Sequence, residues 1–197
     1  MQLKNFKNNK AFTLVETLVA ISILSLSITA TFTAVQNGIQ NSTLAKDQTA
    51  AFYLAQEAME FIKNKRDENA LNSISGGPNQ WLTGMSNLTG DPCWFGGGGI
   101  SQKVCMIDSP AKTITYCGTT FDTCPSLNQD TVPSSSTYGL FGYSSGWTPT
   151  IFKREIQFKE VSPTNPGKEV EVTIRMSWTS RWGSKSFQVT ETLFNRQ

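Results

Sequence analysis

A single carboxylate lies near the start of the longest apolar stretch of the chain. The stretch runs from Phe12 to Val35, and Glu16 is its only ionisable side chain. A charged side chain deep in a bilayer costs about 2.5 to 3.5 kcal/mol on insertion scales, so such residues generally have a function and a partner. Glu16 is therefore the first candidate functional residue. The simpler alternative is that its side chain reaches water at the membrane surface.

The four cysteines are the second group that could do chemistry. Cys93, Cys105, Cys117 and Cys124 all follow the apolar stretch, in a region rich in glycine, serine and proline. An even number of cysteines in an oxidising compartment predicts two disulfides. We favour Cys93 with Cys105 and Cys117 with Cys124, because these loops are the shortest. The main alternative pairs Cys105 with Cys117 and Cys93 with Cys124. A zinc site is not expected, since the closely spaced cysteine pairs of such sites are missing.

Composition excludes several kinds of catalytic and metal site. The chain has 197 residues and no histidine, which excludes Ser-His-Asp and Cys-His catalysis and imidazole metal ligands. Asp108, Asp122 and Asp130 stand in turn-like sequences, where aspartate caps the turn. No catalytic residue, metal or cofactor is predicted. A group of aromatic residues is expected to cover a sheet, with a binding surface as the alternative: Tyr138, Phe141, Tyr143 and Trp147.

The apolar stretch is long enough to cross a membrane. Its 24 residues would extend roughly 36 Å as a helix, against a hydrocarbon core of about 30 Å. Lys4, Lys7 and Lys10 precede it with no acidic residue among them, so this end stays in the cytoplasm by the positive-inside rule. A secretory signal peptide has a shorter apolar core, of about 7 to 15 residues. The sequence thus predicts a membrane-spanning helix followed by an extracytoplasmic region.

Helical spacing of apolar residues continues from Leu44 to Arg66, which predicts an amphipathic helix whose apolar face packs on a sheet. One helix is therefore expected from Phe12 to about Arg66. Glycine and proline then mark irregular loops at 69–101 and at 119–146.

Alternating apolar and polar residues predict strands at 150–161, 169–179 and 186–194, joined by turn sequences into an antiparallel meander. The first of these strands places Phe152, Ile156 and Phe158 on one face. A weaker hairpin is predicted at 103–107 and 113–117. The basic residues of the region are expected on solvated strand faces: Lys153, Arg154, Lys159, Arg175, Arg181 and Lys185.

The residues around Glu16 resemble a known processing signal. The junction reads Lys10-Ala11-Phe12-Thr13-Leu14-Val15-Glu16, which is similar to the cleavage and methylation signal of type IV prepilins and of type II secretion pseudopilins. In that family a membrane peptidase cuts after the small residue and methylates the new amine. The resemblance implies cleavage between Ala11 and Phe12, N-methylation of Phe12, and assembly through Phe12 and Glu16. Two positions depart from the family pattern: Ala11 replaces the usual glycine, and Thr33 replaces a proline common in major pilins.

The resemblance covers about residues 1 to 69 and implies a fold. That fold is α+β, with a long N-terminal helix packed on a small antiparallel β-sheet head in a lollipop arrangement. Four parts are expected: a basic leader peptide at 1–11, a transmembrane and filament-core helix at 12–36, the amphipathic half of the helix at 37–68, and a disulfide-containing globular β head at 69–197.

The function implied by the resemblance is structural. The chain is expected to be a minor pilin of a type IV pilus or related filament, because the proline is missing and the second half of the helix is similar to minor members. Its expected partners are other pilin subunits, prepilin peptidase, the inner-membrane assembly platform and, before assembly, membrane lipid.

The expected location is a single pass of the inner membrane with an extracytoplasmic C-terminus, then an extracellular pilus or a periplasmic pseudopilus. The alternatives are a type II secretion pseudopilin, or an unprocessed membrane-anchored adhesin or DNA-binding protein. Nucleic-acid binding is not expected, because losing the three leader lysines takes the net charge from +2 to −1.

Overall fold

The structure, a computed structural model, describes residues 13–75, 80–88, 90–96, 102–161, 168–181 and 183–195. The chain divides into two compact units, Met1–Lys46 and Asp47–Gln197. One helix, α1 (Leu14–Ile74), begins in the first unit and continues into the second unit. In the first unit, the described residues are Thr13 and the part of α1 up to Lys46. The second unit also contains an antiparallel sheet, and the part of α1 that belongs to this unit packs on the sheet. The architecture is therefore the predicted α+β arrangement.

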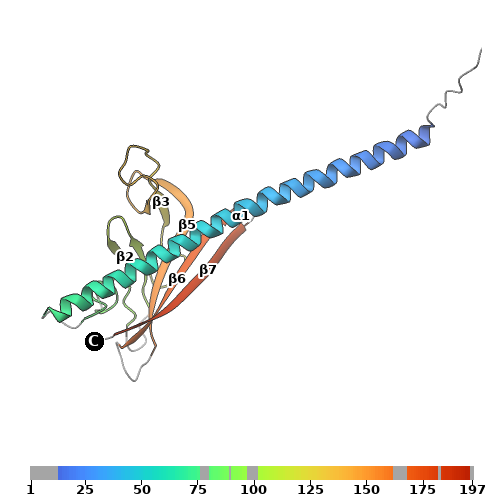
Figure 1. Cartoon of the computed structure of the whole chain (residues 1–197). Helices are drawn as coiled ribbons and strands as arrows, with labels where there is room; N and C mark the ends of the chain where they lie inside the picture. The colour runs from blue at the N-terminus through green and yellow to red at the C-terminus, as the bar shows by residue number, and fades with distance from the viewer. Residues whose placement is uncertain are drawn as a thin grey trace, which may run out of the picture. The chain divides into compact units, whose positions relative to one another are not determined.

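In the second unit, α1 runs along one face of the sheet (Figure 1). There it buries one stripe of small and apolar side chains. The members recur at helical spacing, as the sequence predicts: Ala51, Leu54, Ala55, Ala58, Met59 and Ile62. The helix ends at Ile74 rather than near Arg66. Asn69, 8% exposed, explains part of this extension, because its amide donates to the carbonyls of Trp81 and Thr83, each at 3.0 Å. This contact ties the last turns of α1 to the segment that follows it.

The sheet contains β1 (Val104–Asp108), β2 (Thr113–Gly118), β3 (Ser126–Gln129), β4 (Phe141–Gly142), β5 (Thr148–Glu160), β6 (Glu169–Ser180) and β7 (Gly183–Phe194). Every pairing is antiparallel, and β5 is the central strand. One edge of β5 pairs with β6, which pairs with β7. The other edge is shared by β3, opposite residues 148–153, and β1, opposite Ile156 and Gln157.

The predicted meander and hairpin are confirmed. Strands β5, β6 and β7 form the meander, and β1 with β2 forms the hairpin. The inward face carries Phe152, Ile156 and Phe158 of β5, all buried. From β6 and β7 it carries a further row: Val170, Val172, Ile174, Met176, Trp178 and Leu193. Alternation along a strand was therefore sufficient to identify the core face.

The assignment of 119–146 as loop was wrong at two places, where the structure has β3 and β4. These strands have four and two residues, too few for alternation to show. Polar residues also occupy much of β3, whose sequence is Ser-Leu-Asn-Gln. The strand conformation of β3 comes from its pairing with the long strand β5, which is distant in sequence. The local sequence of β3 therefore does not predict it.

Candidate functional site

The first turn of α1 holds Glu16 through a helix cap. Thr13 precedes the helix, and its hydroxyl accepts a hydrogen bond from the backbone N–H of Glu16 at 3.2 Å. Thr13 and Glu16 have the spacing of a capping box, which satisfies N–H groups that have no partner within the helix. Glu16 thus occupies the third helical position, where the positive end of the helix dipole favours a carboxylate. The predicted cleavage residues Ala11 and Phe12 lie outside the described residues.

The helix after Glu16 is apolar and exposed on every side. Twelve large apolar side chains are each 51% to 75% exposed: Leu14, Val15, Leu18, Val19, Ile21, Ile23, Leu24, Leu26, Ile28, Phe32, Val35 and Ile39. Within the described parts of the chain, α1 is long and apolar enough to cross a membrane, judged by length and composition. A soluble monomer rarely exposes so large a contiguous apolar surface. This segment therefore needs lipid or other helices around it.

Hydroxyl groups in this apolar segment bond to the helix itself. Five serine and threonine side chains donate to the carbonyl four residues earlier, at 2.8 to 3.1 Å: Ser22, Ser27, Thr29, Thr31 and Thr33. Such bonds satisfy a hydroxyl without water, which suits an apolar environment. The helix is continuous through Thr33 and Gly38.

These features of the N-terminal helix coincide with a family match. Residues 6–32 match the family model described as the prokaryotic N-terminal methylation motif. The chain carries this motif. It is the signal motif of type IV pilins and pseudopilins, and it spans the capped start of α1 and Glu16. No curated protein and no solved structure matches the chain.

The motif indicates a type IV pilin-like or pseudopilin protein, a class that is structural rather than catalytic. It implies processing by prepilin peptidase and assembly with other pilin subunits. The motif and the exposed apolar helix together fit a membrane-anchored protein that ends up outside the cytoplasm, either extracellular or periplasmic.

In the second unit, a buried arginine joins the helix to the sheet, although its sequence position predicted a solvated side chain. Arg154 was expected on a solvated face but is fully buried. Its guanidinium donates to the carbonyl of Leu54 in α1 at 2.9 Å and to that of Ile107 in β1 at 2.7 Å. Glu57 lies 3.6 Å away as an ion-pair partner. Alternation could have found it, because Arg154 falls between Phe152 and Ile156 on the inward face of β5.

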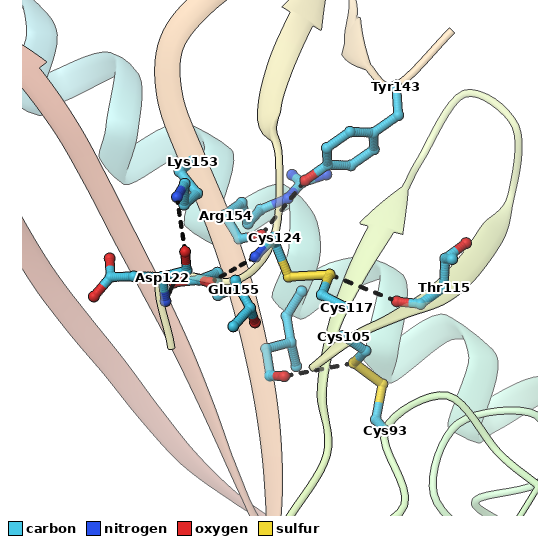
Figure 2. The surroundings of a disulfide bond; sticks show 12 residues. Cys93, Cys105, Thr115, Cys117, Asp122, Cys124, Tyr143, Lys153, Arg154 and Glu155 are labelled. Carbon is cyan, nitrogen blue, oxygen red and sulfur yellow. Dashed lines mark hydrogen bonds between the residues drawn. A yellow bond between two sulfur atoms is a disulfide. The ribbon is translucent and has the colours of Figure 1, made fainter. Parts of the chain in front are cut away.

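The two disulfides join Cys93 to Cys105 and Cys117 to Cys124, which is the pairing that the sequence favoured. Beside the second disulfide, Glu155 is fully buried on the outward face of β5 (Figure 2). Its carboxylate accepts the backbone N–H groups of Asp122 at 2.9 Å and Cys124 at 3.1 Å. A buried charge needs such partners. Glu155 therefore fixes the loop that the disulfide closes, and we refer to residues 119–124 as the disulfide loop.

Aromatic residues of the region between β3 and β5 divide between core and surface. Phe141 packs edge-on against Phe152 of the core, with ring centroids 6.4 Å apart. Burial raises the pKa of Tyr143 to about 12, so its hydroxyl stays protonated and donates to the carbonyl of Arg154 at 3.4 Å. Tyr138 is 58% exposed. Two of the four aromatic residues, Phe141 and Tyr143, thus cover the sheet as expected.

Two of the three aspartates expected to cap turns do so, Asp108 and Asp130, whereas the carboxylate of Asp122 pairs with Arg175 instead. Asp108 accepts the N–H groups of Ala111 and Tyr143. Asp130, only 2% exposed, accepts the N–H of Val132 at 2.9 Å and the hydroxyl of Thr137 at 2.7 Å. Among the described residues, no group of three or more His, Cys, Asp or Glu could hold a metal ion. These carboxylates therefore hold loops in place.

Replacing Asp130 with asparagine should make the stability of the second unit less dependent on pH. Hydrogen bonds from Ser135, Thr137 and the Val132 N–H lower the pKa of Asp130. A lowered pKa gives stability that is present above the unfolded value of about 3.9 and is lost as pH falls through the folded pKa. In urea unfolding, Asp130→Asn should be less stable than wild type at neutral pH and equal to it in strong acid. The exposed Glu60→Gln is the matched control, and an Asp130→Asn deficit independent of pH would contradict the assignment.

Proposed function

We propose that this chain is a minor pilin, a low-abundance structural subunit of a type IV pilus or related filament. Prepilin peptidase cuts after Ala11 and methylates Phe12, and the mature subunit then assembles into the filament through its N-terminal helix. The observation that carries the proposal is the methylation motif at the head of an exposed apolar helix. The same surface that needs lipid before assembly would contact neighbouring helices within a filament.

Glu16 would then pair with the N-terminal amine of a neighbouring subunit. Cutting before Phe12 creates a cationic amine four residues from Glu16, about one helical turn away. Two unit charges 4 Å apart attract by about 4 kcal/mol at an effective dielectric constant of 20. The cap from Thr13 holds the backbone at Glu16 in the first turn, as such a pairing requires. A subunit inserted out of register would leave both charges unpaired in an apolar environment.

The assignment as a minor subunit is supported by the uninterrupted helix. Major pilins commonly carry a proline at the place of Thr33, whereas α1 here continues through Thr33 with its hydroxyl bonded to the carbonyl of Thr29. A type II secretion pseudopilin is the second candidate, because the same motif is used there. The third is an adhesin or DNA-binding protein that stays anchored and unprocessed.

Fractionation of cells that carry the assembly machinery tests the filament assignment. Filaments sheared from such cells should contain the chain in an amount well below that of the main subunit, as measured by quantitative immunoblot. Cells that lack the assembly ATPase provide the control and should keep the chain in the membrane fraction. If the chain stays in the membrane in both strains, it is an anchored protein. If it equals the main subunit in amount, it is not a minor pilin.

A further inference from the structure

The outward face of the sheet has an open groove over β5, β6 and β7, with a volume of about 480 Å³. Phe152 and Arg154 of β5 point to the core and to α1. Lys153 lies between them in the strand, so its side chain points to the opposite, outward face. Hydroxyl and cationic side chains dominate its lining: Ser126, Lys153, Arg175, Ser177, Thr179, Ser184, Lys185 and Ser186. Nothing in the proposed filament function uses this groove.

Strand register aligns four of these side chains in one row. Ser126 of β3 lies opposite Lys153 of β5, Lys153 opposite Ser177 of β6, and Ser177 opposite Ser186 of β7. Directly opposed residues share a face, and neighbouring strands lie about 4.8 Å apart. The row therefore presents one ammonium group between hydroxyls at regular spacing. We call these four residues the polar row.

One wall of the groove is formed by the disulfide loop. The Nζ of Lys153 donates to the carbonyl of Asp122 at 3.2 Å, while Arg175 pairs with the Asp122 carboxylate at 2.9 Å (Figure 2 shows Lys153, Asp122 and Glu155). Arg175 also lies over the ring of Phe121, 5.4 Å from its centroid. With the disulfide and Glu155 beneath, these contacts order the wall before any ligand arrives. Order of this kind lowers the entropy cost of binding.

The chemistry of the groove favours a ligand with many hydroxyl groups and a localised negative charge. Hydroxyls of the polar row can each donate and accept a hydrogen bond, and an ammonium group has three donors, of which Lys153 uses one on Asp122. Lys153, Arg175 and Lys185 against Asp122 leave two net positive charges in the lining, which suits a small acidic ligand. Nucleic acid requires neutralisation of several phosphates by a larger basic surface.

We propose that the polar row binds an acidic saccharide, with its carboxylate or sulfate group at Lys153. The sugar hydroxyls bond to Ser177 and Ser186, and the disulfide loop limits the ligand on one side. The site lies in the second unit, so binding does not depend on processing or assembly of the N-terminal helix.

Calorimetric titration of the full chain in detergent micelles tests this site. The probes are oligogalacturonate for carboxylate, a heparin oligosaccharide for sulfate, a neutral malto-oligosaccharide of equal length, and oligothymidylate for nucleic acid. At least one acidic saccharide should bind about tenfold more tightly than the neutral one, a difference of about 1.4 kcal/mol. Whichever acidic probe binds identifies the preferred acid group.

Two variants locate the binding to the polar row. Lys153→Gln removes the cation, and Ser177→Asp places a carboxylate opposite Lys153, so each should weaken acidic-saccharide binding about tenfold or more with an unchanged urea midpoint. Lys159→Gln is the matched control, because Lys159 is exposed on the same face of β5, about 20 Å away. The proposal is overturned if neither acidic saccharide binds, if oligothymidylate binds as tightly, or if Lys159→Gln weakens binding as much. If one of the two variants fails to fold, the other decides.

Discussion

Substitution of Arg154 with alanine is expected to lower the free energy of unfolding of the second unit by about 3 to 5 kcal/mol, because it removes two hydrogen bonds from a charged donor, each worth about 1.5 to 3 kcal/mol. Arg154 is fully buried and bonds to the carbonyls of Leu54 and Ile107, so its loss removes the hydrogen bonds that link α1 to β1. Alanine also leaves a cavity where the long side chain packed. Urea unfolding of the full chain in detergent, followed by tryptophan fluorescence, measures the change.

The position of Ile107 explains why this arginine matters. Only Val104 and Cys105 of β1 pair with β5, so Ile107 lies past the end of that ladder. The Arg154 guanidinium supplies a donor to β1 at the point where β1 leaves β5 and β3 takes its place. The ion pair with Glu57 is the lesser contribution, because Glu57 is 38% exposed and its carboxylate is 3.6 Å away.

Two controls separate these contributions. Glu57→Gln should cost clearly less than Arg154→Ala, and Lys159→Ala, on the exposed part of the same strand, should change stability by no more than about 0.5 kcal/mol. If Arg154→Ala is as mild as Lys159→Ala, then Arg154 does not hold the helix to the sheet. If Glu57→Gln is as severe as Arg154→Ala, the ion pair is the main contact.

Replacement of Glu16 with alanine should reduce incorporation of the chain into filaments at least about tenfold while leaving membrane insertion intact. The proposed pairing with a neighbour's amine would be lost, and an energy of 1.4 kcal/mol already corresponds to a factor of about ten. Insertion should not suffer, because removal of a charge from an apolar helix favours the bilayer. The measurement is the ratio of chain in sheared filaments to chain in membranes.

Thr17→Ala is the matched control for Glu16. Thr17 is also in the first turns of α1, but its hydroxyl bonds only to the carbonyl of Leu14, at 2.8 Å, and it has no charge. This variant should assemble like wild type. Wild-type incorporation of Glu16→Ala would contradict the proposed pairing, and equal loss in Thr17→Ala would show that any change in this turn disturbs assembly.

Periodicity predicted the parts of the fold whose partners are close in sequence. The apolar stripe of α1 and the alternation in β5, β6 and β7 needed only local patterns, and the meander followed from the turns between them. The end of α1 was missed because Asn69 bonds to carbonyls at 81 and 83, a contact that no helical pattern contains. Strand β3 was missed for the same kind of reason, since only its pairing with β5 makes it a strand.

The candidate sites also divide into those that the local sequence reveals and those that depend on contacts with distant segments. Glu16 was evident from the sequence, because a single acidic residue in an apolar stretch is unusual whatever the fold of the rest of the chain. Glu155 has no such signal: its neighbours are ordinary strand residues, and its burial depends on the disulfide loop packing over it. The polar row is likewise a product of register among four strands, of which one, β3, was not predicted.

Mass spectrometry of the N-terminal peptide is the most direct test of the central claim that this chain is a precursor processed at its methylation motif. The full chain would be expressed with an active prepilin peptidase, with an inactive one, and with none. We expect a peptide that begins at methylated Phe12 with the active enzyme only, and an intact Met1 leader in the other two samples. An intact leader in all three samples would contradict it and leave an unprocessed membrane-anchored protein.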